Sequence, residues 1–442
     1  MKLELTSADF GTERGARDIA QRIDELVEAR RAPFGTKLPP IRTLARVLGV
    51  SPTTIAGAYL ELERRGVAKG QGRAGTVLVR RNPPLGAARV FHMFPDQTSS
   101  ATHDLSTGFP DPRLLPRLDV KALSAAALGG EARNYLNRHL AEELAPVLAE
   151  LLEVEPENLS VVNGSLDALD RLLAQACVPG DRVIVEEPGF PPIFDLLDVH
   201  RLVPVPVRSD AEGVDPDSLA NALEHRAQAM IWQPRAQNPT GVSTSERRLG
   251  ELAELLAASR PITVIEDDHS GLVSMAPRVT MRGMVPGPVA TVFGFSKSHG
   301  PDLRISAIAA GEDLLAKVVE RRRLGPSWTS GVIQRVLALL LTEAAPTARV
   351  ESARGLYAER LELLAGRLRD AGAAVTSTDG LNCWIPVSSE LGVITDLARI
   401  SVVVAPGSAF YLDGRGQPHI RVTTAAIDTL APGLIDVIER WL

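Results

Sequence analysis

The sequence predicts a two-part α/β protein, in which a small helical head precedes a larger body built around a mostly parallel β-sheet. Charge divides along the chain: residues 14–81 hold 14 Lys and Arg against 6 Asp and Glu, a balance of +8, which leaves −14 for the remainder of a chain whose total is −6. In the head, apolar residues recur at helical spacing, whereas the body alternates short apolar runs with helical stretches. The length of 442 residues fits two or three domains better than one.

The composition argues against several classes of protein. Hydrophobic residues make up 45% and charged residues 23% of the chain, as in ordinary soluble proteins. No apolar run is long enough to span a bilayer, and the N-terminus MKLELTSADF lacks the apolar core of a signal peptide, so we expect a cytoplasmic protein with no membrane partner. Cys177 and Cys383 lie far apart and outside any ligand motif, which rules out a disulfide framework and a cysteine-based metal site. No metal centre is predicted.

Three short helices are expected in the head. Ile19, Ile23 and Leu26 fall on one face of a first amphipathic helix. A second helix over residues 41–48 opens after two prolines and has Gly49 as its C-terminal stop. Ser51 can cap a third helix, which buries one apolar stripe: Ile55, Ala58, Tyr59 and Leu62. The second and third helices therefore predict a tight helix-turn-helix.

The free face of the third helix has the geometry that fits a DNA major groove, with Thr53, Thr54 and Gly57 exposed. The stretch GVAKGQGRAGTVLVRR reads as a β-hairpin wing. Basic residues lie around this surface and can neutralise phosphates: Arg42, Arg64, Arg65, Lys69 and Arg73. The alternative, a helical cap that never meets DNA, is the less favoured interpretation.

The amino-acid sequence of this region is specific enough to indicate a family. LPPIRTLARVLGVSPTTIAGAYLELERRG followed by GRAGTVL resembles the winged helix-turn-helix head of GntR-family regulators over most of residues 14–80. The resemblance implies that double-stranded DNA is the partner, and that four residues are the DNA contacts: Arg42, Thr53, Thr54 and Arg73.

A second architecture follows the head. Residues 82–104 contain prolines, glycine and small polar residues without periodicity, so we expect a linker there. Beyond it, RVIVEEP, ITVIEDD and ATVFGFS look like strands of a parallel sheet, whose ligands bind beyond the carboxyl ends of the strands. We expect residues 1–81 to form the head, 105–335 a large domain and 336–442 a smaller α+β domain.

Three turns at expected strand ends carry candidate binding residues. In VVNGSLDALD, Gly164 and Ser165 open a helix whose N–H groups form a phosphate cradle, unless the turn is an ordinary strand-to-helix connection. In EEPGF, Phe190 can stack on a flat heterocycle, although a lone Phe is more often core. In AQNPTG, Asn238 can offer its amide to a ring oxygen.

The fourth feature pairs EDD with FSKSHGPDLR. A carboxylate at the end of a buried strand is costly unless it meets a cation, and Asp267 can pair with a protonated pyridine nitrogen. Lys297 follows the next strand and can form a Schiff base with an aldehyde. Arg304 comes seven residues later and can clamp a phosphate. Taken singly, each residue also fits a structural Asp–Arg bridge beside a surface lysine.

The order of these motifs resembles the fold-type I aminotransferases over roughly residues 104–442, and with the head the whole chain resembles the MocR subfamily of GntR regulators. The resemblance implies pyridoxal 5′-phosphate (PLP) as the cofactor, attached to Lys297. It also implies roles for these residues: Asp267 at the ring nitrogen, Asn238 at the ring oxygen, Phe190 stacked on the ring, and Gly164, Ser165, Ser296 and Arg304 near the phosphate. Arg421, in HIRVTTA, matches the arginine that holds an amino acid's carboxylate, or is a strand-end surface arginine.

The sequence departs from the family pattern at three places. His269 stands where the family commonly has Tyr, and it either reaches the cofactor oxygen or fills space. Leu166 replaces a common Gln after the phosphate turn. The stretch reaching across the family's dimer survives at best as YLNRHL, which puts a cross-subunit role of Tyr135 in doubt. These losses leave cofactor attachment intact and weaken the case for efficient transamination.

We therefore favour a transcription regulator whose body senses PLP or an amino compound and changes DNA binding by the head. The resemblance implies a head-to-tail homodimer, which would read paired half-sites. The spelling QPRAQNPTG resembles subfamily members linked to vitamin B6 metabolism. Two rivals are a working aminotransferase that carries a DNA-binding head, and a regulator with a vestigial cofactor pocket. Lys297 and Asp267 together make the second rival the weaker.

Overall fold

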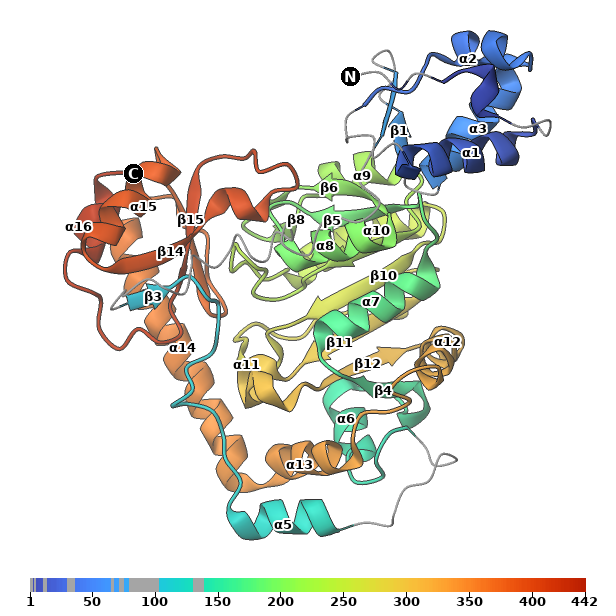
Figure 1. The fold of residues 1–442 in the computed structure, drawn as a ribbon. Helices are drawn as coiled ribbons and strands as arrows, with labels where there is room; N and C mark the ends of the chain where they lie inside the picture. Colours follow the sequence, from blue (N-terminus) through green and yellow to red (C-terminus); the bar gives the residue numbers. More distant parts are fainter. Residues whose placement is uncertain are drawn as a thin grey trace. The chain divides into compact units, whose positions relative to one another are not determined.

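The computed structural model describes the following residues: 3, 5–10, 14–29, 36–64, 67–70, 75–78, 103–129 and 139–442. The chain divides into two compact units, one containing the head within residues 1–87 and the other most of the chain from residue 88 onward. Each unit is described by itself. Figure 1 colours both along the sequence.

The head contains the helix-turn-helix and the hairpin that the sequence predicts. Its elements are η1 (Ser7–Asp9), α1 (Ala16–Ala29), α2 (Ile41–Leu48), α3 (Pro52–Arg64), β1 (Ala68–Gly70) and β2 (Thr76–Leu78). Between α2 and α3, Gly49 adopts a φ of 65°, a left-handed conformation that glycine tolerates best. The expected apolar stripes form one core, in which Ile19, Ile23 and Ile55 are fully buried. β1 and β2 pair antiparallel.

A seven-stranded sheet organises the body, with the order β4-β12-β11-β10-β9-β5-β6. The strands are β4 (Leu159–Val162), β5 (Arg182–Glu186), β6 (Val203–Val207), β9 (Ala229–Trp232), β10 (Thr263–Asp268), β11 (Val289–Gly294) and β12 (Ser306–Ala310). β5, β9, β10 and β11 run parallel, and β12 is antiparallel to both of its neighbours. Strands β4, β9 and β11 are buried along their whole length, which explains their continuous apolar sequences.

Helices and short connections surround this sheet. The α-helices are α5 (Val120–Leu128), α6 (Ala145–Leu152), α7 (Ser165–Ala176), α8 (Pro191–His200), α9 (Pro216–Leu223), α10 (Glu246–Ala258), α11 (Ser296–His299), α12 (Glu312–Arg323) and α13 (Gly331–Thr342). The short 3₁₀ helices and strands are η4 (Pro156–Asn158), β7 (Ser209–Asp210), β8 (Gly213–Val214), η5 (Gly271–Val273) and η6 (Pro301–Leu303).

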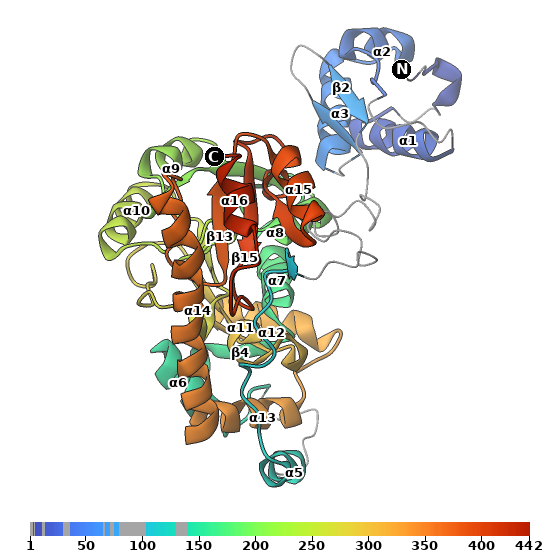
Figure 2. The same cartoon turned by 90° about the vertical axis from the view of Figure 1, so that its left-hand side faces the viewer.

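A smaller four-stranded sheet has the order β13-β15-β14-β3. Its strands are β3 (His103–Leu105), β13 (Asn382–Pro386), β14 (Val402–Pro406) and β15 (His419–Thr423), accompanied by α15 (Glu390–Arg399), η7 (Gly407–Phe410) and α16 (Leu434–Glu439). The long helix α14 (Ala344–Asp370) extends from α13 to this sheet, as both views show (Figures 1 and 2).

Two expected boundaries differ from the structure. β3 begins at His103, inside the segment expected as a linker, and pairs parallel with β14 of the small sheet. A three-residue strand leaves no periodic signal, and its pairing partner is far along the chain, so the sequence pattern does not reveal it. The expected boundary after residue 335 falls inside α13. Among the described residues, no helix combines the length and apolar character needed to cross a membrane.

Candidate cofactor and effector site

The motifs identified in the sequence meet at one edge of the large sheet. Asp267 lies in β10, Ser165 begins α7 after β4, and Lys297 lies in α11 directly after β11. These strands are neighbours or near neighbours, and parallel strands deliver their carboxyl ends to the same edge of a sheet. The structure thus brings together residues that are more than 100 positions apart in the sequence.

Asp267 presents one unsatisfied carboxylate oxygen. The side chain is 1% exposed, and its Oδ2 accepts a hydrogen bond of 2.8 Å from Gln233 Nε2. Its Oδ1 is buried and has no hydrogen-bond partner among the described residues. Burial raises the pKa of Asp267 to about 7. Because an unpaired buried carboxylate oxygen is costly, the site fits a ligand that brings a cationic N–H, as a protonated pyridine does.

Gln233 contacts two residues of the candidate site, and the sequence analysis missed it. It directly follows β9, and its Oε1 accepts the backbone N–H of Asn238 at 2.8 Å while its Nε2 donates to Asp267. Its own backbone N–H donates to Glu186 at 2.7 Å. Glu186 is buried, and burial raises its pKa to about 8. The signal available in the sequence was the position of Gln233 at a strand end, five residues before Asn238.

Lys297 is held close to a backbone carbonyl. Its Nζ donates to Gly108 O at 2.6 Å and lies 5.9 Å from the centroid of the Phe109 ring. Burial and the neighbouring Arg421 lower the pKa of Lys297 to about 8. The lowered pKa increases the share of neutral amine near neutral pH, and the neutral amine is the form that attacks carbonyl carbons.

The turn between β4 and α7, which the sequence analysis expects to bind a phosphate, requires glycine at position 164. Gly164 has a φ of 102°, and a Cβ built there would lie 2.9 Å from Arg304 Nη2. Arg304 donates to the carbonyl of Asn163 at 3.1 Å, and Ser165 Oγ lies 3.1 Å from Ser306 Oγ. The turn therefore places an exposed guanidinium beside the N-terminus of the twelve-residue helix α7, which is an anion-binding arrangement.

Two further residues that the sequence analysis missed support this turn. Arg322, which is 1% exposed, contacts Asn163 Oδ1 at 3.4 Å and Thr329 Oγ1 at 3.1 Å. Thr329 in turn donates to Asn163 Oδ1 at 2.9 Å. These contacts come from α12 and the segment after it, so no local pattern around the turn predicts them.

Arg421 is a buried cation rather than a surface arginine. It is fully buried in β15, and burial lowers its pKa to about 9. Nη1 donates to Asn238 Oδ1 at 3.1 Å, Nη2 donates to the carbonyl of Ser106, and the guanidinium carbon lies 4.9 Å from the centroid of the Phe410 ring. No carboxylate pairs with it in the described part of the chain, so it can receive an anionic group.

The other residues that the sequence analysis assigns to the site lie in the loops and elements that follow β5, β9, β10 and β11. Asn238 is buried in the loop after β9, and Phe190 is half-buried against the cluster of Trp384, Ala405 and Phe410. Ser296 is half-buried at the start of α11. His269 Nε2 lies 3.0 Å from the carbonyl of Ala236, and burial together with Lys297 lowers the pKa of His269 to about 3. The imidazole is therefore neutral and carries its proton on Nε2, so Nδ1 is an acceptor.

The residues of the head that are predicted to contact DNA differ in their exposure to solvent. Arg42 on α2 and Thr53 on α3 are exposed. Thr54 is half-buried, and its Oγ1 lies 2.8 Å from Ser51 Oγ in the cap of α3. Gly57 was expected on the exposed face and instead faces α1, where a Cβ would lie 3.2 Å from Ala16 Cβ. The close packing of α1 against α3 is a tertiary contact that the helix pattern does not reveal.

Three sequence predictions lie outside the described residues: Arg65, Arg73 and Tyr135.

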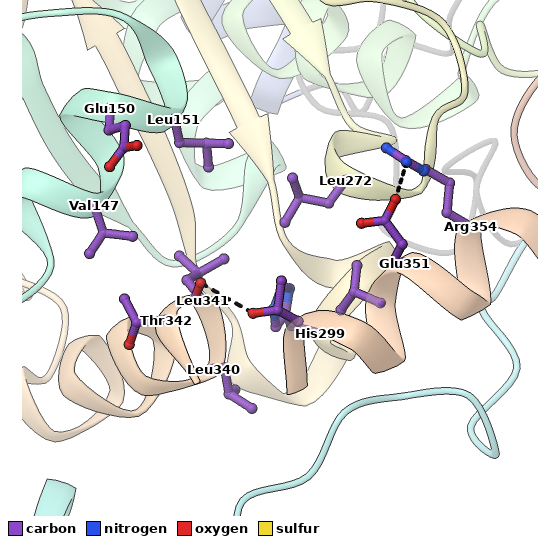
Figure 3. A pocket seen from close by; sticks show the side chains of 12 residues that line it. Val147, Glu150, Leu151, Leu272, His299, Leu340, Leu341, Thr342, Glu351 and Arg354 are labelled. Carbon is purple, nitrogen blue, oxygen red and sulfur yellow. Dashed lines mark hydrogen bonds and ion pairs between the residues drawn. The ribbon is translucent and has the colours of Figure 1, made fainter. Parts of the chain in front are cut away.

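A separate hollow of about 360 Å³ lies among α6, η5, α13 and α14 (Figure 3). Its lining is largely apolar, including Val147, Leu151 and Leu340, and Glu351 and Arg354 at one side are paired with each other. The hollow shares no lining residue with the predicted site.

Fold and site together define a class of protein, a helix-turn-helix head joined to an aminotransferase-like body. The family model for bacterial regulatory proteins of the gntR family matches residues 16–78, and the model for aminotransferase class I and II matches residues 103–430. The chain therefore belongs to the MocR-type transcription regulators of the GntR family, in which these two domains are fused.

Individual relatives agree with this family. The chain is 33% identical over 436 residues to the vitamin B6 salvage pathway transcriptional repressor PtsJ of Salmonella typhimurium, covering 96% of this chain and 99% of that relative. It is 26% identical to the HTH-type transcriptional regulator TauR of Rhodobacter capsulatus, covering 89% of each. Among solved structures, the α-aminoadipate aminotransferase LysN of Thermus thermophilus has a TM-score of 0.67 at 24% identity, covering 80% of this chain and 95% of that one, which shows the shared fold.

Proposed function

We propose that the body of this regulator binds PLP at Lys297 and that occupancy of the site controls DNA binding by the head. The observation that carries the proposal is the buried, unpartnered Oδ1 of Asp267, at the same sheet edge as a lysine of lowered pKa. Asp267 would hold the ring nitrogen, and Lys297 would hold the cofactor covalently. When bound, PLP supplies an electrophilic carbon and an electron-withdrawing ring.

The other residues of the site would position the cofactor. Arg304 and the N-terminus of α7 offer donors for a phosphate, and a Cβ at position 164 would collide with the guanidinium that does so. The proposed cofactor-binding set is Gly164, Ser165, Phe190, Asn238, Asp267, His269, Ser296, Lys297 and Arg304. The neutral imidazole of His269 has an acceptor on Nδ1, which would receive a hydrogen bond from a protonated group of the ligand.

Arg421 supports an amino-acid-like effector. It is a buried guanidinium without a carboxylate partner among the described residues, and it contacts the same turn as Lys297. A ligand with an amine and a carboxylate would engage both cations. Because PtsJ is a repressor of vitamin B6 salvage, PLP itself is the first ligand to test.

The head would bind an operator with paired half-sites, since a head-to-tail homodimer presents two heads. The exposed positions of Arg42 and Thr53 support DNA contacts there, with Thr54 and Arg73 as the further proposed contacts. Arg42→Ala should weaken operator binding by about tenfold. Fluorescence anisotropy with a labelled operator measures this, and wild-type affinity would remove Arg42 from the interface.

Visible absorption spectra test the cofactor site directly. Wild-type protein with PLP should show a yellow band that borohydride abolishes, and Lys297→Ala should lack it. Lys317→Ala, an exposed lysine on α12, is the matched control and should retain the band. If both lysine variants behave alike, Lys297 is not the attachment site.

A second function, transamination, is favoured by the presence of both Asp267 and Arg421 in the proposed site. Turnover of an amino donor with a 2-oxo acid distinguishes the two functions, because a sensor needs only to bind its ligand. Sustained product formation beyond one equivalent per site would establish the enzyme, and a single equivalent would support the regulator.

A further inference from the structure

Two cations of the site, the half-buried Lys297 and the fully buried Arg421, donate hydrogen bonds to the backbone of one short turn. The turn comprises Ser106–Phe109 and follows β3 directly. Lys297 Nζ donates to the carbonyl of Gly108 at 2.6 Å, and Arg421 Nη2 donates to the carbonyl of Ser106. The lysine and the arginine to which the proposed function assigns the two ligand contacts thus donate to the same turn.

The backbone of the turn at Gly108 lies close to the guanidinium of Arg421. Gly108 has a φ of 65°, and a Cβ built there would lie 3.4 Å from the guanidinium nitrogens. Its backbone N–H donates to Thr423 Oγ1 at 2.8 Å, and Ser106 donates twice to Asp104 Oδ1, at 3.0 Å and 2.6 Å. The bond to Thr423 joins the turn to β15 of the small sheet, and the bonds to Asp104 join it to β3.

The turn lies next to the segment that joins the body to the head. β3 is an edge strand of the small sheet and pairs with β14 through three register partners, from His103 to Leu105. Residues 82–102 precede it in the sequence and lead back to the head. Edge strands held by few pairs open at low free energy, so a displacement of the turn can change how β3 is held.

We propose that the Ser106–Phe109 turn transmits occupancy of the site to the segment before β3, an inference that rests on the proposed function. When the neutral amine of Lys297 condenses with an aldehyde, a C=N bond forms and the aldehyde oxygen leaves as water with the two nitrogen protons. The donor to Gly108 O is then lost. A carboxylate bound to Arg421 competes with the carbonyl of Ser106 for Nη2. Each ligand group therefore removes one of the two hydrogen bonds that the site cations donate to the turn.

Hydrogen exchange on the full-length wild-type protein tests the first step. Saturating PLP should accelerate amide exchange in a peptide spanning residues 103–110 by about threefold or more, because the carbonyl of Gly108 loses its hydrogen bond from Lys297. Lys297→Ala lacks the nitrogen that forms the bond, so PLP should leave exchange in that peptide unchanged.

A matched pair of variants tests the coupling to DNA. Thr423→Val removes the acceptor of the Gly108 N–H together with a donor to Asn382 Oδ1 at 3.2 Å, whereas Thr424→Val removes a hydroxyl that donates to Leu381 O at 3.2 Å. With its turn loosened, Thr423→Val without PLP should shift its operator affinity toward the value that wild-type protein has with PLP, by at least half of the wild-type response. Thr424→Val should respond as the wild type does.

The outcomes separate this inference from the proposed function. If PLP gives no lysine-dependent absorption band, both fail. If the band forms and operator affinity responds to PLP while exchange in residues 103–110 stays unchanged or slows, only the role of the turn is overturned. Equal operator responses in the Thr423 and Thr424 variants would overturn it as well.

Discussion

At the residue scale, burial shifts the pKa of each ionisable group of the candidate site toward its neutral form. The pKa of Asp267 is raised to about 7, that of Lys297 lowered to about 8, and that of Arg421 lowered to about 9. Each charged group contacts an amide or a carbonyl instead of an opposite charge. Such groups gain most from a ligand that brings the missing counter-charge.

Gln233→Leu should weaken PLP binding by at least about tenfold. The substitution leaves Asp267 Oδ2 without its 2.8 Å donor and the Asn238 N–H without its acceptor, and one unsatisfied buried group costs about 1–3 kcal/mol. PLP titration followed by absorption measures the affinity. Gln417→Leu, at an exposed position, is the control, and equal affinities for the two variants would exclude the role of Gln233.

Without cofactor, Asp267 should make stability decrease with pH. Its pKa is raised from 3.8 to about 7 in the folded protein, so the folded state binds more protons than the unfolded state between these values. The free energy of unfolding therefore falls as pH rises through this window. Asp267→Asn removes the contribution, and its melting temperature should fall less than that of the wild type from about pH 5 to about pH 7.

Thermal unfolding at several pH values measures this difference. Asp302→Asn, at an exposed position, should keep the wild-type slope. If Asp267→Asn also keeps that slope, the carboxyl is not protonated in the folded protein.

At the element scale, the head depends on the contact of α1 with α3. Gly57 is the residue of α3 that faces Ala16 of α1, while its neighbour Ala56 is exposed. The glycine is therefore a packing residue, which lets two helices approach within the small core of the head.

Gly57→Val should destabilise the head by about 1–3 kcal/mol, since even a Cβ would lie 3.2 Å from Ala16 Cβ and the helices must separate. Ala56→Val adds the same side chain to the same helix at an exposed position and should cost less than about 1 kcal/mol. Operator binding and thermal unfolding should fall together in the first variant. A smaller loss at position 57 than at position 56 would refute this packing.

At the scale of the whole molecule, the residues proposed to bind DNA and those proposed to bind the cofactor lie in separate compact units. Removal of residues 1–80 should abolish operator binding and leave the lysine-dependent PLP band within about twofold of its full-length intensity, because the proposed site residues all lie beyond residue 103. Retained operator affinity in the shortened protein would place DNA binding in the body.

Much of the site was accessible from the sequence because its chemistry sits in short motifs at strand ends. Asp267, Lys297 and Gly164 stand in local patterns, and the parallel sheet brings such patterns to one edge. Gln233 and Arg322 were missed, since their roles depend on partners that only the folded chain supplies.

The sequence alone determined the two-part organisation, the helix-turn-helix and the family, because hydrophobic periodicity and short sequence motifs are local properties of the chain. The tertiary structure decided that Arg421 is buried, that Gly57 packs against α1, and that Lys297 and Arg421 donate hydrogen bonds to the turn of residues 106–109. These facts depend on which distant segments meet. Long-range contacts are set by the packing of the whole core, which no window of the sequence contains.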